Sequence, residues 1–102
     1  MRIIAKNRIE EWAEQRRDAA RSLLAWYDIA VDADWRSLQD VRADFPTADG
    51  VAVDSGRTVT VFNIRGNTYR MIVAIHYNSQ IVFMLRFLTH KAYDGARWKR
   101  EL

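Results

Sequence analysis

The hydrophobic periodicity of this chain changes once, near Val51, and that change constrains the fold more than any other feature. Before it, apolar residues recur three or four positions apart, which is the spacing of one helix face. After it, they alternate with polar residues, as in a half-buried strand. Helices first and strands afterwards predict an α+β fold, with two N-terminal helices packed on a curved antiparallel sheet.

The first half is predicted to hold a short strand at 1–5 and a helix from about 7 to 30, opened by a capping box of Asn7 and Glu10. A second, shorter helix is predicted to be capped by Asp34 and stopped by Pro46. The residues expected to face the core are Ile9, Trp12, Ala13, Ala20, Leu23, Leu24 and Tyr27 on the first helix and Trp35, Leu38, Val41 and Phe45 on the second.

The second half is predicted to form an antiparallel meander. Its strands are 51–53, 58–65, 68–77 and 80–88, and turn-forming residues separate them. The segment from Tyr93 to Trp98 is a candidate for one more helical turn. We expect a single domain spanning residues 1–102.

Composition excludes several kinds of site. The 102 residues contain no cysteine and two histidines, so disulfides, thiolate nucleophiles and Cys-based metal sites are excluded and we expect no metal and no cofactor. No apolar run approaches the roughly 20 residues of a membrane span, and the N-terminus turns acidic too soon for a signal peptide. These features predict a cytoplasmic, unprocessed protein without membrane contact.

Charge is distributed unevenly along the chain. Residues 1–54 hold 8 Lys/Arg against 11 Asp/Glu, whereas residues 55–102 hold 8 against 2. A concentrated positive field of this kind favours a polyanionic partner such as nucleic acid, and it also suits an acidic protein.

The strand pattern places two arginines together. In 68–77 and 80–88 the odd residues are mostly apolar, so we expect the odd faces to pack on the helices. Pairing odd with odd leaves Arg70 and Arg86 on the other face, opposite or diagonal to each other.

The hairpin around Gly66-Asn67 adds to that face. A two-residue loop there pairs Asn63 with Arg70 and Ile64 with Tyr69. The sequence therefore predicts one polar cluster of Asn63, Arg65, Arg70 and Arg86.

Two explanations of this cluster are open. Like charges on neighbouring strands repel, and an anion bridging both guanidiniums offsets the repulsion, which suits phosphate. Alternatively, each arginine reaches solvent or a helix carboxylate. We favour the anion site, because His90 and Tyr93 follow Arg86 closely and offer proton transfer or stacking. His76 lies six residues from Arg70, and a structural or exposed role is expected for it.

Three motifs resemble the HigB toxins, a branch of the RelE-like toxins. They are W-x-x-L-x-x-V-x-x-x-F-P-x-A-D at 35–49, V-F-N-I-x-G-N-x-Y-R at 61–70 and T-H-x-x-Y-D at 89–94. The resemblance implies an mRNA interferase, in many members active on the translating ribosome. It also implies metal-independent cleavage, in which the 2′-OH attacks the adjacent phosphate and leaves a 2′,3′-cyclic phosphate and a 5′-OH.

Site roles follow from the matching motif positions. Arg70 and Arg86 are expected to stabilise the scissile phosphate, and His90 is the leading proton-transfer group with Tyr93 as second choice. The resemblance further implies RNA contacts from Asn63, Arg65, Asn67 and Lys91, with Arg97, Lys99 and Arg100 extending the basic surface.

The implied partners are mRNA, the ribosome and a HigA-like helix-turn-helix antitoxin, with operator DNA bound only through the antitoxin complex. Two other interpretations stay open at this point. One is a noncatalytic RNA-binding or protein-interaction module, and the other is a degenerate toxin kept as an interaction partner.

Overall fold

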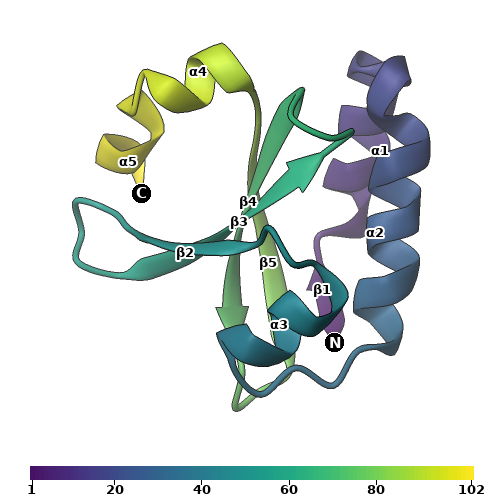
Figure 1. Ribbon diagram of the computed structural model, residues 1–102, viewed down its shortest axis with the longest axis vertical. Helices are drawn as coiled ribbons and strands as arrows, with labels where there is room; N and C mark the ends of the chain where they lie inside the picture. The colour runs from purple at the N-terminus through teal and green to yellow at the C-terminus, as the bar shows by residue number, and fades with distance from the viewer.

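The computed structural model describes residues 1–102 and confirms the α+β order (Figure 1). Its five strands form one sheet in the order β1-β5-β4-β3-β2, in which β2 to β5 make the expected antiparallel meander and β1 pairs parallel with β5. The strands are β1 (Arg2–Ile4), β2 (Asp49–Ala52), β3 (Thr58–Ile64), β4 (Tyr69–His76) and β5 (Ile81–Thr89). The helical elements are α1 (Lys6–Gln15), η1 (Arg17–Ala19), α2 (Ala20–Asp32), α3 (Leu38–Asp44), α4 (His90–Asp94) and α5 (Arg97–Glu101).

The helix expected over 7–30 is broken into α1, η1 and α2. In a continuous helix Arg16 would share the inward face of Trp12 and Ala20, four residues away on either side. Such a helix would also be roughly 36 Å long at 1.5 Å per residue, whereas the longest extent of the molecule is 31 Å. The backbone instead leaves the helical region at Arg16 (φ −129°, ψ 79°), and α2 returns beside α1 (Figure 1).

Two further details of the predicted first helix are wrong. The N-cap of α1 is Ala5 with no side-chain capping bond, so Asn7 and Glu10 form no capping box. Leu24 is 49% exposed, while Trp26, which was not among the expected core residues, is buried. None of the helices is long and apolar enough to cross a membrane.

Ser37, rather than Asp34, caps the next helix, α3. Its Oγ accepts from the Asp40 amide at 3.4 Å, and the Asp40 carboxylate accepts from the Arg36 amide at 2.8 Å. Asp34 instead pairs with the exposed Arg36 side chain at 3.3 Å. The helix ends at Asp44, just before Phe45 and Pro46, as the proline predicts.

We expect Ser37→Ala to lower the free energy of unfolding by about 0.5–1 kcal/mol, since it removes the capping oxygen. Asp34→Ala is the matched control, and it should change stability by less than about 0.5 kcal/mol because an exposed ion pair contributes little. Urea unfolding followed by circular dichroism measures both changes. An equal loss in the two variants would contradict the assignment of the cap.

Helices α1, α2 and α3 cover one face of the sheet, and we call the core between them the helix-side core. Aromatic rings dominate it: Trp26 meets Phe62 edge to face with ring centroids 5.3 Å apart, and Phe45 meets the same ring at 5.2 Å. Odd residues of β4 point into this core, as the alternation predicts.

The opposite face of the sheet carries a second, smaller core under α5, which we call the C-terminal core. Its buried residues are Val53, Val59, Val61, Ile72 and Trp98. Figure 1 shows α4 and α5 on the side of the sheet away from α1 and α2. The face that holds the predicted arginines is therefore partly roofed by the C-terminal helices.

A β-bulge divides the register between β4 and β5. From Tyr69 to Ile72 odd residues pair with odd, as predicted, but from Val73 the pairs join odd to even, beginning with Val73 and Met84. The expectation that Ile81, Phe83 and Leu85 face the helices is therefore wrong. Val82 and Met84 occupy the helix-side core, and Leu85 packs against the C-terminal core.

Candidate active site

The strand register brings Asn63, Arg70 and Arg86 to one face of the sheet. Asn63 pairs with Arg70 across β3 and β4, which confirms the predicted hairpin register. Arg70 pairs with Leu88 and Ile72 pairs with Arg86 across β4 and β5. Arg86 is thus two residues from the position opposite Arg70, and the two arginines are diagonal neighbours.

Arg70 is held in a nearly buried position, 9% exposed, by neutral groups. One terminal nitrogen, Nη2, donates to the Asn67 side-chain oxygen at 2.8 Å. The other, Nη1, donates to the main-chain carbonyls of Tyr69 and Asn67 at 3.2 and 3.3 Å. None of the ion pairs in the molecule involves Arg70.

The ring of Tyr93 lies against Arg70. The guanidinium carbon is 5.7 Å from the ring centroid, within the range of a cation–π contact. The Tyr93 ring also stacks on the ring of Trp98, with centroids 5.2 Å apart and planes 18° apart. The Trp98 indole N–H donates to the Tyr93 carbonyl at 3.0 Å. A buried tryptophan therefore fixes the tyrosine that contacts Arg70.

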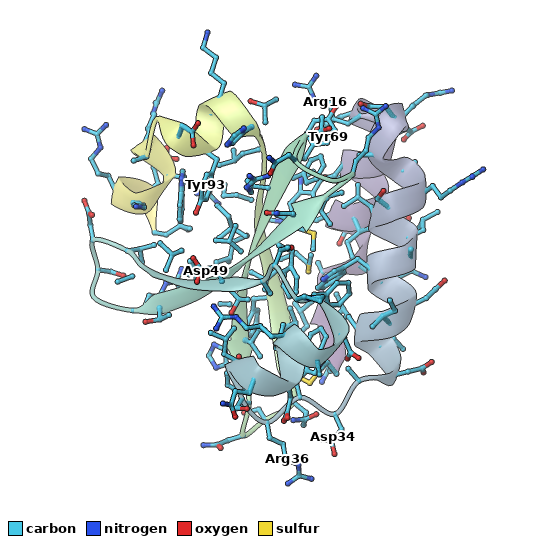
Figure 2. The ribbon with its side chains drawn as sticks, in the orientation of Figure 1. Arg16, Asp34, Arg36, Asp49, Tyr69 and Tyr93 are labelled. Atoms are coloured by element: carbon cyan, nitrogen blue, oxygen red, sulfur yellow. The ribbon has the colours of Figure 1, made fainter.

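The pKa of the Tyr93 hydroxyl is raised above its usual value of 10.0, chiefly by burial and further by the charge of Asp49, and Arg70 only partly opposes this. Figure 2 shows Tyr93 beneath the C-terminal helices, on the side of the molecule where Asp49 lies. The hydroxyl therefore stays protonated at neutral pH and is equipped to donate a hydrogen bond or a proton, and not to accept a proton as a base.

Arg86 is half-buried, and its Nη1 donates to the carbonyl of Leu85 at 2.9 Å. It has no carboxylate partner among the ion pairs. Neither Arg70 nor Arg86 pairs with a carboxylate, although the charges of Asp49 and Asp94 act on the neighbouring Tyr93. Two guanidiniums free of ion pairs on one face suit phosphate, whose oxygens match the arginine fork.

His90 begins α4, immediately after β5. Its amide donates to the Thr68 carbonyl at 3.2 Å, which ties α4 to the β3–β4 turn. Its Nε2 lies 3.5 Å from the Asp94 carboxylate, and the imidazole is exposed. Lys91, the next residue, is also exposed. The structure thus places the predicted proton-transfer group at the turn that holds Asn67.

Arg65 does not join the cluster, and this part of the prediction is wrong. It adopts a left-handed conformation in the turn (φ 55°) and pairs with Asp18 at 3.2 Å. The Tyr69 hydroxyl also donates to the Asp18 carboxylate, whose two oxygens lie 2.8 and 2.9 Å away, beside the helices. Side-chain direction in a turn does not follow strand alternation, so the register gave no guide to Arg65.

Comparison with known proteins bears on this site. Residues 19–96 match the family HigB_toxin, described as the RelE-like toxic component of a toxin-antitoxin system. The chain belongs to the HigB toxin family. Escherichia coli O6:H1 has a relative named mRNA interferase HigB that is 28% identical over 102 residues, covering 99% of this chain and 97% of its own length. The mRNA interferase toxin HigB of Escherichia coli strain K12 is 24% identical over 94 residues, covering 92% and 88% respectively.

Two residues of this HigB-family chain that contact the site were missed from the sequence, and both lie outside the matched residues 19–96. Trp98 was expected only to end a helical turn, although a large aromatic side chain among the charged residues of that segment is a candidate for burial. Arg8, described below, bonds the backbone of β5 from α1, and no local pattern indicates such a contact.

The far end of the sheet has a different character. Two open hollows of about 280 and 430 Å³ lie there, lined by Asp34, Arg36, His76, Tyr77, Asn78, Ser79 and Gln80. His76 is exposed and packs edge to face on Phe83, which fits the structural role expected for it. No group of three His, Asp or Glu side chains is arranged to hold a metal ion.

Proposed function

We propose that this HigB-family chain is an endoribonuclease that cleaves mRNA in the cytoplasm on translating ribosomes. The observation that carries the proposal is the nearly buried Arg70, oriented by neutral groups only and diagonal to Arg86. A guanidinium held without a carboxylate keeps its charge available for an anion. The names of the relatives support mRNA as that anion.

The proposed chemistry needs only side chains. The 2′-oxygen attacks the adjacent phosphorus as its proton passes to a base, and the bond from phosphorus to the 5′-oxygen breaks as that oxygen takes up a proton. The products are a 2′,3′-cyclic phosphate and a 5′-OH. Arg70 and Arg86 stabilise the extra negative charge of the crowded phosphorane.

Proton transfer is divided between His90 and Tyr93 in this proposal. His90 takes the 2′-OH proton, because its exposed imidazole begins α4 beside the turn that holds Asn67. Tyr93, kept protonated by burial, donates to the departing 5′-oxygen. Asn67 orients Arg70, and Asn63 and Lys91 contact the RNA strand.

The family also supports an antitoxin partner for this chain. We propose a HigA-like helix-turn-helix protein that neutralises the nuclease, with operator DNA contacted only through the complex. The positive second half of the chain is the part that suits an acidic inhibitor.

The test is induction of the chain without its antitoxin, followed by mapping of new 5′ ends in cellular messages. Purified chain is then added to messages with and without ribosomes, each with and without EDTA. Cuts that persist in EDTA, bear a 5′-OH and require ribosomes support the whole proposal. Binding of RNA without cleavage in any arm would instead identify a noncatalytic RNA-binding module.

We expect Tyr93→Phe to lower kcat by about 10²-fold with little change in KM, because it removes only the proposed acid. The ring, and thus the contact with Arg70, is retained. Because burial raises its pKa, the Tyr93 hydroxyl loses its proton at a higher pH than an ordinary tyrosine does. The wild-type rate should therefore show no fall due to Tyr93 through neutral and mildly alkaline pH, and any such fall should come at a higher pH than for an ordinary tyrosine. An unchanged kcat in Tyr93→Phe would exclude the hydroxyl from proton transfer.

A further inference from the structure

A β-bulge decides which face of the sheet Arg86 occupies. Toward the β4–β5 turn Val73 pairs with Met84, whereas on the other side of the bulge Ile72 pairs with Arg86, so Leu85 is the extra residue. A ladder continued without the shift would pair Ile72 with Leu85 and Met71 with Arg86. Arg86 would then point into the helix-side core beside fully buried Met71.

The bulge lies where β5 loses its outer neighbour. Strand β1 pairs with β5 only from Ile81 to Phe83, so the next carbonyls on that edge have no strand partner. Arg8 of α1 takes over there: its Nη1 donates to the carbonyls of Met84 and Leu85 at 3.0 and 3.1 Å. A helix side chain thus supplies hydrogen bonds to the edge carbonyls that lack a strand partner at the bulge.

The Leu85 carbonyl links this contact to the proposed active site. It accepts from Arg8 at 3.1 Å and from Arg86 Nη1 at 2.9 Å. Two guanidiniums therefore share one oxygen, one reaching it from α1 and the other from β5.

We infer that Arg8 is a positioning residue for Arg86: by holding the Leu85 carbonyl it fixes the bulge and the direction of the Arg86 guanidinium. The inference rests on the proposed role of Arg86 at the scissile phosphate. It assigns a function to a residue of α1 that lies outside the family match and on the opposite side of the sheet.

Phe87 offers the competing explanation. Its ring stacks on Trp12 and Tyr69, with centroids 5.6 and 5.0 Å away, and so anchors the register beyond the bulge. If Phe87 alone determined the geometry of Arg86, Arg8 would be dispensable. The experiments below separate the two.

The first experiment is a double-mutant cycle on RNA cleavage. Arg8→Gln should lower kcat/KM by about tenfold, since a small misplacement of a phosphate-binding group is costly. In the Arg86→Ala background the same change should cost less than about twofold, because the residue through which it acts is gone. Arg21→Gln, an exposed arginine of α2, is the matched control and should have no effect in either background. Equal losses with and without Arg86 would overturn the inference.

The second experiment does not depend on cleavage. Inorganic phosphate is titrated into labelled protein, and the guanidinium resonances of Arg70 and Arg86 are followed by NMR. We expect Arg8→Gln to weaken the response of Arg86 and its cross-strand NOE to Ile72, and to leave the response of Arg70 unchanged. If the phosphate response of Arg86 and its NOE to Ile72 are unaltered in Arg8→Gln, the inference is overturned, even if the wild type proves not to be a nuclease. If the wild type does not cleave RNA but Arg8→Gln shifts Arg86, the positioning stands and the proposed function fails.

Deletion of Leu85 provides a rescue. Without the extra residue, Arg86 falls opposite Ile72 in a regular ladder, so the bulge and its carbonyl clamp are no longer needed. In this background Arg8→Gln should leave the Arg86 phosphate response unchanged. If Arg8→Gln alone fails to fold, its recovery in the deletion background supports the inference, and failure to recover overturns it.

Discussion

Arg70→Ala should lower kcat/KM for RNA cleavage by about 10³-fold, and Arg70→Lys by about 10²-fold, because loss of one transition-state donor has effects of this size. The lysine keeps the charge but not the planar fork. The guanidinium bonds Asn67 and lies over Tyr93. A single ammonium cannot keep both contacts and also bind the proposed phosphate. Single-turnover cleavage of a short message on ribosomes measures both values.

The matched control is Arg57→Lys, an exposed arginine of the same basic half of the chain. It should change cleavage by less than about threefold, since an exposed charge contributes through screened attraction. Affinity for an uncleavable RNA, with a 2′-deoxy sugar at the cut, separates binding from chemistry. If Arg70→Lys binds this RNA and cleaves its 2′-hydroxyl counterpart as well as the wild type does, Arg70 is a binding residue and the nuclease mechanism proposed here is wrong.

The site could be predicted where its geometry is local. The Gly66-Asn67 turn and the alternation of apolar residues on either side suffice to pair Asn63 with Arg70, and the structure confirms that pair. The turn type and the side-chain alternation each depend on residues only a few positions apart, so both can be predicted from a single sequence.

The parts that could not be predicted depend on distant contacts. The bulge at Leu85 leaves the alternation of β5 ambiguous, and the Arg8 contacts that accompany it come from 76 and 77 residues away. The helix break at Arg16 was indicated locally, because a charged residue fell on the apolar face of the predicted helix. The contacts that the break makes possible are not local: Asp18 accepts hydrogen bonds from the β3–β4 hairpin. Local patterns thus predict which face of the sheet carries Arg70 and Arg86, whereas contacts between distant residues determine how these side chains are oriented.

Trp98→Ala should lower the free energy of unfolding by about 3 kcal/mol. Trp98 is 2% exposed and belongs to the C-terminal core that joins α5 to the sheet. Its removal leaves a cavity and takes away both the stacking partner of Tyr93 and the indole donor to the Tyr93 carbonyl. Chemical unfolding of the purified chain gives the change in free energy.

Activity distinguishes this position from an ordinary core residue. Trp12→Ala is the matched control, because Trp12 also stacks on a ring, Phe87 at 5.6 Å, but on the helix side of the sheet. At a temperature where both variants are folded, Trp98→Ala should lose about tenfold or more in kcat/KM, since Tyr93 no longer fixes Arg70. Trp12→Ala should lose stability while its cleavage rate stays within about threefold of the wild type. Trp98→Phe, which retains a stacking ring but is smaller and lacks the indole donor, should recover most of the activity. If folded Trp98→Ala cleaves as fast as Trp12→Ala, the stack beneath Arg70 is a packing feature alone, and the orientation of the guanidinium comes from Asn67 and the β4 carbonyl.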